Sequence, residues 1–408
     1  MPRSKPPKSP VPLWRPVKAD PAAVYPREEV ERSKSYNRPI QRSKRVSLVI
    51  GFAFLAIWSA THVGRGLVRG LGVRGWALQL LVLLAVFFAI DTVLSLPVAI
   101  WKLGHERRWE FSTQTNKGFA VDQLKNYVVN LVLTGALLTA LFAVIRATRV
   151  WWLWGSVVYA GFFVTLIALA PTLQKVFNKY SPLDDPVLLE RLRALAVRAG
   201  ASISQFLVMD ASKRTRKDNA FVGGLGKTRR VVIYDTMLDM GHDPIEVVIA
   251  HELGHWRRRH TYRGAIVQVL TGPLVLGVTA LLLRWGALLR FVGAREARDP
   301  VAFVIVLFGI GLMFSVLQMG GMWFSRWAER AADFDSLELT GDTAAFRELW
   351  RKMPERNLPD LDPSWWERLK HSHPEPHERY AYAAVWEQSH PDRVAPAAEA
   401  RQDIERTP

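Results

Sequence analysis

The chain has 408 residues, 49% of them hydrophobic, and its 54 Lys and Arg outnumber 37 Asp and Glu to give a formal net charge of +17. It contains no cysteine, which excludes disulfide bonds, thiolate zinc sites and cysteine nucleophiles, so a metal would have to be held by His, Asp or Glu. No nucleic-acid recognition motif accompanies the positive charge. We therefore predict no nucleic-acid partner and assign the charge to membrane topology and to contact with the lipid bilayer.

The first 44 residues are rich in Pro, Lys and Arg. This composition buries too little apolar surface to fold alone, and we predict a disordered tail over residues 1–44. The first apolar run begins only near Val46, which is unlike a cleavable signal peptide.

Six apolar stretches are long enough to cross a bilayer as helices, which takes about 20 residues. They lie near residues 47–63, 77–101, 126–147, 151–173, 265–287 and 301–325. Lys and Arg are dense before the first stretch and sparse in the loop after it, so the positive-inside rule places the N-terminus in the cytoplasm. With six spans, residues 174–264 and 326–408 face the cytoplasm as well.

The segment between the fourth and fifth stretches has the pattern of a small α+β module. Residues 185–198 predict a helix with an aspartate N-cap and a proline in the first turn. Residues 204–209 predict a strand, and residues 219–222 and 230–234 flank a glycine-rich turn as a hairpin would. The fold class is therefore mainly α: a multi-pass transmembrane helical bundle with a small cytoplasmic α+β module.

A His-Glu-x-x-His segment lies on the next predicted helix, which we expect to start at Asp243 as N-cap, with Glu246 completing an arrangement close to a capping box. His251 and His255 are four residues apart, so both imidazoles project from one face and can bind one Zn²⁺. Glu252 could take a proton from a zinc-bound water and pass it to the leaving amine. The alternative is a pair of surface histidines beside a basic run.

Residues 325–333 continue the last apolar stretch into the cytoplasm and carry two acidic side chains that suit this site. Glu329 could be the third ligand, leaving one position open for water as in catalytic zinc sites. Asp333, one turn later on the same face, could accept a hydrogen bond from a ligand histidine. Taken alone, the segment is more typical of a solvated helix end, but beside the histidine pair we favour the metal site.

Residues 371–379 contain three of the ten histidines. His373 could stabilise the oxyanion that forms when a peptide carbonyl is attacked. Arg379 could do the same or could anchor the loop through a carboxylate, and the sequence leaves both open. The hairpin edge at Asn219 and Ala220 could bind an extended peptide as an added strand, or it could be an ordinary structural hairpin.

Together these residues resemble the type I CAAX prenyl endopeptidase family, membrane zinc proteases that cleave C-terminal to a prenylated cysteine. The similar stretches are residues 31–36, 95–97, 113–125, 212–214, 219–220, 235–236, 251–255, 325–333 and 373–379. The resemblance implies a single Zn²⁺ held by His251, His255 and Glu329. It also implies Glu252 as the base, with Asn219 and His373 contacting substrate or transition state. The family usually has seven spans, and the basic tail stands in place of the first.

We therefore predict a membrane-embedded zinc metalloendopeptidase that hydrolyses peptide bonds of peptide or protein substrates, with Glu252 as general base. Two alternatives are an HtpX-type protease for membrane protein quality control and a catalytically silent scaffold or sensor. The N-terminus, the active site and the C-terminus are expected on the cytoplasmic side of the cell membrane. The predicted order is a disordered tail (1–44), four spans (45–175), the metalloprotease segment (176–263), two spans (264–325), a helical segment with the third ligand (326–390) and a disordered tail (391–408).

Overall fold

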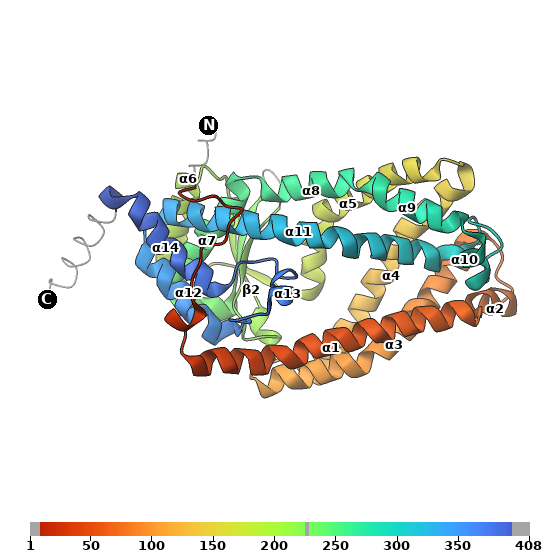
Figure 1. The fold of residues 1–408 in the computed structure, drawn as a ribbon, viewed down its shortest axis with the longest axis horizontal. Coiled ribbons are helices and arrows are strands. Elements are labelled where there is room, and N and C mark those ends of the chain that lie inside the picture. The colour runs from red at the N-terminus through yellow and green to blue at the C-terminus, as the bar shows by residue number, and fades with distance from the viewer. Residues whose placement is uncertain (1–8, 225–227, 394–408) are drawn as a thin grey trace.

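The structure, a computed structural model, describes residues 9–224 and 228–393 and contains, within them, six helical segments long and apolar enough to cross a membrane. This confirms the predicted number of spans. The segments are Arg27–Ala60 (α1), Trp76–Arg108 (α3), Asn116–Ala147 (α4), Trp151–Phe177 (α5), His260–Arg284 (α8, His260–Leu270, and α9, Gly272–Arg284) and Pro300–Thr340 (η5, Pro300–Ala302, and α11, Phe303–Thr340). The short helices α2 (Val63–Gly70) and α10 (Gly286–Phe291) connect spans at the end far from the sheet (Figure 1).

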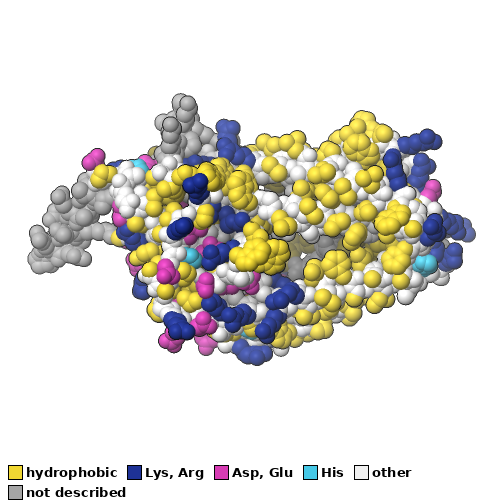
Figure 2. Space-filling model, in the orientation of Figure 1, with side chains coloured by type: hydrophobic (Ala, Val, Ile, Leu, Met, Phe, Trp, Pro, Cys, Tyr) yellow, Lys and Arg dark blue, Asp and Glu magenta, His cyan; other side chains and the backbone are white. Residues whose placement is uncertain are grey.

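An aromatic cluster joins the first two spans to the last. Phe54 and Trp58 of α1 pack on Phe87 of α3 with ring centroids 4.7 and 5.1 Å apart, and Phe87 packs on Phe303 of α11 at 5.4 Å. Hydrophobic side chains cover the flanks of the spans, whereas Lys and Arg gather at both ends of the molecule (Figure 2). This distribution suits helices whose middles lie in hydrocarbon and whose ends lie among headgroups.

The opposite end of the molecule carries a four-stranded sheet and a layer of helices (Figure 1). The strand order is β1-β2-β4-β3, with β2 and β4 parallel and the other two pairs antiparallel. The strands are β1 (Tyr180–Pro182), β2 (Gln205–Met209), β3 (Ala220–Gly223) and β4 (Arg230–Tyr234), and the helices are η1 (Pro21–Ala23), α6 (Pro186–Arg198), η2 (Ala211–Lys213), η4 (Asp235–Met240), α7 (His242–Arg257), α12 (Thr343–Asn357), α13 (Trp365–Arg368) and α14 (Pro376–Ser389). Because β3 is the last strand in this order, one of its sides pairs with no strand among the described residues.

The predicted elements of this module are present, and one predicted helix start was wrong. The Asp185 side chain accepts a hydrogen bond from the Leu188 N–H at 2.9 Å and caps α6 as expected. However, α7 starts at His242 with Gly241 in the N-cap position, and no side chain caps it. Asp243 and Glu246 instead form ion pairs with guanidinium groups of α6, because this helix packs directly against α7.

The prediction of a disordered tail over residues 1–44 was wrong for residues 27–44, which form the first half of α1. Tyr25, just before the helix, is buried, and its hydroxyl donates to the Trp350 carbonyl at 2.6 Å. Within the helix, the Tyr36 hydroxyl donates to Glu106 Oε1 at 2.7 Å. The composition argument treats the segment in isolation, whereas here it folds against partners distant in sequence. Residues 1–8 and 394–408 lie outside the described residues.

Residues 9–25, which we call the N-terminal strap, lie across the C-terminal helices. Val11, Leu13 and Val17 pack against a buried cluster formed mainly by α11, α12 and α14. The Val17 N–H donates to Glu378 Oε1 at 3.3 Å, and the Leu13 carbonyl accepts from Arg330 at 3.3 Å. The strap therefore covers the helices that also carry part of the candidate site.

Candidate metal centre

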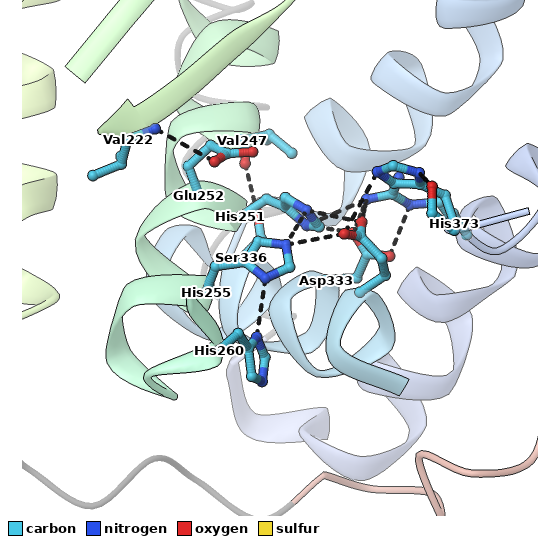
Figure 3. Close-up of polar contacts among 12 residues, drawn as sticks. Val222, Val247, His251, Glu252, His255, His260, Asp333, Ser336 and His373 are labelled. Atoms are coloured by element: carbon cyan, nitrogen blue, oxygen red, sulfur yellow. Dashed lines mark hydrogen bonds and ion pairs between the residues drawn. The ribbon is translucent and has the colours of Figure 1, made fainter. Parts of the chain in front are cut away.

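Two helices bring three potential metal ligands together. His251 and His255 lie on successive turns of α7, and Glu329 faces them from α11. One ligand atom from each residue lies within 4.8 Å of the other two. The Nε2 atoms of the histidines are 3.1 Å apart, and each lies 3.2 Å from a carboxylate oxygen of Glu329 (Figure 3).

A glycine inside the motif permits this close approach of α7 and α11. A Cβ atom on Gly254 would lie 3.1 Å from Ala332 Cα and 3.0 Å from Asp335 Cβ, both on α11. Nearby, the Ser336 hydroxyl donates to the Val247 carbonyl at 2.8 Å and holds the two helices in register. The backbone at Gly254 thus contacts α11 directly, which sets the distance between the histidines and Glu329.

The chemistry of the three residues fits a divalent cation such as Zn²⁺. Glu329 Oε2 is buried and lies 3.2 Å from His251 Nε2, yet it accepts no hydrogen bond from the residues that the structure describes. Burial alone would lower the pKa of His251, but the carboxylates of Asp333 and Glu329 raise it to about 10. The site therefore stabilises positive charge. Two histidines and one carboxylate also form a ligand set found in catalytic zinc sites, which keep a fourth position open.

A buried acid and a buried guanidinium support the first histidine. Asp333, fully buried on α11, lies 2.9 Å from His251 Nδ1, so Asp333 would hold the ring proton on this nitrogen when Nε2 binds a metal. Arg379 of α14 donates two hydrogen bonds to Asp333, at 2.8 and 2.6 Å, and stacks on the Trp350 ring at 3.6 Å. Of the two roles left open for Arg379, these contacts favour anchoring through a carboxylate.

Glu252 follows His251 on α7, and its carboxylate points toward Val222 of β3 (Figure 3). Its Oε2 accepts a hydrogen bond from the Val222 N–H at 3.4 Å. Burial raises the pKa of Glu252, and the neighbouring histidines oppose this shift only in part. A carboxylate with a raised pKa is a stronger base than an ordinary carboxylate, which suits a group that takes up a proton and later releases it.

A cavity of about 500 Å³ adjoins the metal ligands. The predicted substrate residues Asn219 and Ala220 line it together with Glu252 and His373. Apolar side chains of α12 form another part of the wall: Phe346, Leu349, Trp350 and Met353. His373 is largely exposed, and its Nε2 lies 3.5 Å from Glu329 Oε1, so its ring stands at the rim of the metal position.

The start of β3, at Ala220, borders this cavity. The Tyr234 N–H donates to the Asn219 carbonyl at 3.0 Å. The backbone groups of Asn219 therefore point toward β4. In an antiparallel pair the next residue, Ala220, and then Val222 point theirs the other way. The Ala220 N–H meets the side chain of Asn219 at 2.9 Å, and the Val222 N–H meets Glu252.

Sequence reasoning missed three residues that contact the candidate site. His260 lies 2.9 Å from His255, Nδ1 to Nδ1, but a spacing of five residues is not one that a helix places on one face. Trp350 under Arg379 carries no local motif. The Val222 N–H belongs to the backbone and leaves no side-chain signature.

Comparisons with known proteins agree with this geometry. Residues 182–394 match the model of peptidase family M48, and residues 15–179 match the CAAX prenyl protease N-terminal model, described as five membrane helices. Residues 15–179 contain four candidate spans here. A rice protein named CAAX prenyl protease 1 homolog is 27% identical over 313 residues, covering 75% of this chain and 73% of its own.

A Bacillus subtilis protein named uncharacterized metalloprotease YhfN is 28% identical over 307 residues, covering 72% of this chain and 70% of its own. The fold resembles the crystal structure of Ste24p from S. mikatae with a TM-score of 0.75, at 22% identity, over 87% of this chain and 88% of that one. The chain therefore belongs to peptidase family M48 and is a multi-pass integral membrane zinc metallopeptidase of that family.

Proposed function

We propose that this protein is an endopeptidase that hydrolyses peptide bonds with one Zn²⁺ held by His251, His255 and Glu329. The observation that carries the proposal is the convergence of these three ligands beside a buried carboxylate, in a cavity bordered by a free strand edge. A bound Zn²⁺ would polarise a peptide carbonyl and lower the pKa of water.

Glu252 is the proposed general base. Burial raises its pKa, so after taking a proton from the attacking water it can donate that proton to the departing amine. The Val222 N–H contacts Oε2 and holds the carboxylate beside β3, at the edge of the cavity that also contains His251 and Glu329. His373 is proposed to donate a hydrogen bond to the oxyanion of the attacked carbonyl, since its ring stands at the rim of the ligand group.

The free edge of β3 is the proposed binding site for the substrate backbone. An extended peptide could pair with the Ala220 N–H and C=O once the Asn219 side chain turns away from the N–H. Main-chain pairing tolerates many sequences, and the apolar wall of α12 would favour hydrophobic side chains beside the scissile bond. These features support general peptide hydrolysis, with prenylated peptides as one candidate substrate class and damaged membrane proteins as another.

The test compares cleavage by three purified proteins in detergent. Wild type, Glu252→Gln and the matched control Glu190→Gln, which changes an exposed glutamate of α6, are each assayed for bound zinc and for cleavage of an unstructured protein and a farnesylated peptide. We expect zinc in all three and cleavage only by wild type and the control. Zinc without cleavage that depends on Glu252 would contradict the enzyme proposal, and cleavage of only the unmodified substrate would exclude prenyl specificity.

We also propose that the metal centre faces the cytoplasm, because Lys and Arg are dense in early α1, at the end of the molecule that carries the site. The absence of cysteine makes this simple to test. A Glu190→Cys variant should react with an impermeant maleimide in inside-out vesicles and stay unlabelled in intact cells. Labelling in intact cells would place the site on the other side.

A further inference from the structure

The two histidine ligands have different partners on their second ring nitrogen. His251 Nδ1 faces a carboxylate, whereas His255 Nδ1 lies 2.9 Å from Nδ1 of His260, the first residue of α8 (Figure 3). His260 is 6% exposed, and its ring meets the Trp327 ring edge to face at a centroid distance of 5.5 Å. We propose that His260 is a positioning residue that accepts a hydrogen bond from His255 and aims its Nε2 at the metal. This inference rests on the proposed zinc site.

The backbone between the two residues is built to bring them together. In an unbroken helix His260 would lie about 140° around the axis from His255 and could not reach it. Instead the helix breaks after α7, and Arg259 adopts a left-handed conformation at φ 55°, which is unusual for a residue with a side chain. Arg258 fixes this corner through hydrogen bonds of 2.7 and 2.9 Å to the buried carboxylate of Asp335.

Metal binding dictates which ring donates. For His255 Nε2 to offer a lone pair to a cation, its proton must sit on Nδ1. The facing Nδ1 of His260 must then be the acceptor, with its own proton on Nε2. That nitrogen is buried and has no hydrogen-bond partner among the residues that the structure describes. The face of the neighbouring Trp327 ring, inclined at 67°, suits a weak N–H to π contact.

Two substitutions at His260 test its hydrogen bond to His255 and its ring packing separately. In His260→Asn, the amide oxygen stands near the position of Nδ1 and keeps an acceptor. In His260→Phe, the ring packing remains but the acceptor is lost. The adjacent Thr261→Ala changes an exposed residue of the same helix and serves as the matched control. Each protein is purified in detergent, stripped of metal and titrated with Zn²⁺ against a chromophoric chelator.

We expect His260→Phe to bind zinc about 10- to 100-fold more weakly, as is typical when a partner of a ligand histidine is lost. The Asn variant should recover most of the affinity, and the control should match wild type. Spectra of the Co²⁺-loaded proteins give a second readout, and that of the Phe variant should differ from wild type. Unchanged affinity in His260→Phe would overturn the proposal.

If His260→Phe does not fold, the His260→Asn variant provides the test by itself. A folded His260→Asn protein that bound zinc about tenfold more weakly than wild type would also overturn the proposal. Wild-type protein that binds no zinc would refute the metal site itself. Failure of the proposed function is thereby distinguished from failure of the role assigned to His260.

Discussion

Asp333 and Arg379 form a buried pair whose worth can be measured with a double-mutant cycle. Asp333→Asn keeps an oxygen for His251 but leaves the guanidinium without its charge partner, since the nearest remaining carboxylate, Glu329, is 3.7 Å away. Breaking a buried pair from one side costs about 3–5 kcal/mol of folding free energy. The freed guanidinium would also compete with the metal for Glu329, so zinc affinity should fall about 10- to 100-fold.

Arg379→Met alone leaves a buried carboxylate and should be destabilising to a similar degree. The double variant removes both charges, and we expect it to lie within about 1–2 kcal/mol of wild type, because a replaced pair is far less costly than a broken one. Unfolding of the metal-free proteins in detergent gives the stabilities, and chelator competition gives the zinc affinities. If the double variant lost the sum of the two single effects, the pair would not be coupled and the reasoning would fail.

Three other substitutions test separate parts of the molecule. Gly254→Ala should separate α7 from α11 and weaken zinc binding at least about tenfold, as measured by chelator competition. The control Gly264→Ala, whose new methyl group would meet no atom within 4 Å, should leave zinc affinity unchanged. Equal zinc affinities of the two variants would contradict the role of Gly254 in setting the helix spacing. His373→Ala should keep zinc but lower kcat by about 10²–10³-fold, and a full-rate variant would exclude the oxyanion role. Tyr25→Phe leaves the Trp350 carbonyl without its partner and should lower stability by about 1–3 kcal/mol in thermal unfolding, while an unshifted transition would show that this hydrogen bond adds nothing.

The spans and the metal ligands were predictable because their signals are local. A run of apolar residues specifies a span by its length, and the four-residue spacing of His251 and His255 specifies a shared helix face. Glu329 could also be predicted as a ligand, because the last apolar stretch continues into a segment with acidic side chains that could face the histidines.

What escaped prediction depends on contacts between distant segments. Asp243 had the pattern of a helix cap, but a guanidinium of α6 binds it instead. The strap and the early part of α1 were too polar to fold alone, yet Tyr25 of the strap and Tyr36 of α1 form hydrogen bonds with other elements. The contact of His260 with His255 depends on the left-handed backbone conformation at Arg259, which the sequence did not predict.

The contacts of the N-terminal strap constrain the order in which segments of this protein can fold during synthesis. It is translated before the other described elements, but Tyr25 and Val17 bind residues translated 325 and 361 positions later. All six candidate spans are complete before α14 is synthesised, so a nascent chain can be inserted in the membrane while Arg379 is still missing from the metal centre. The contacts of the strap and of Arg379 can therefore form only near the end of translation, after the three candidate metal ligands have been made.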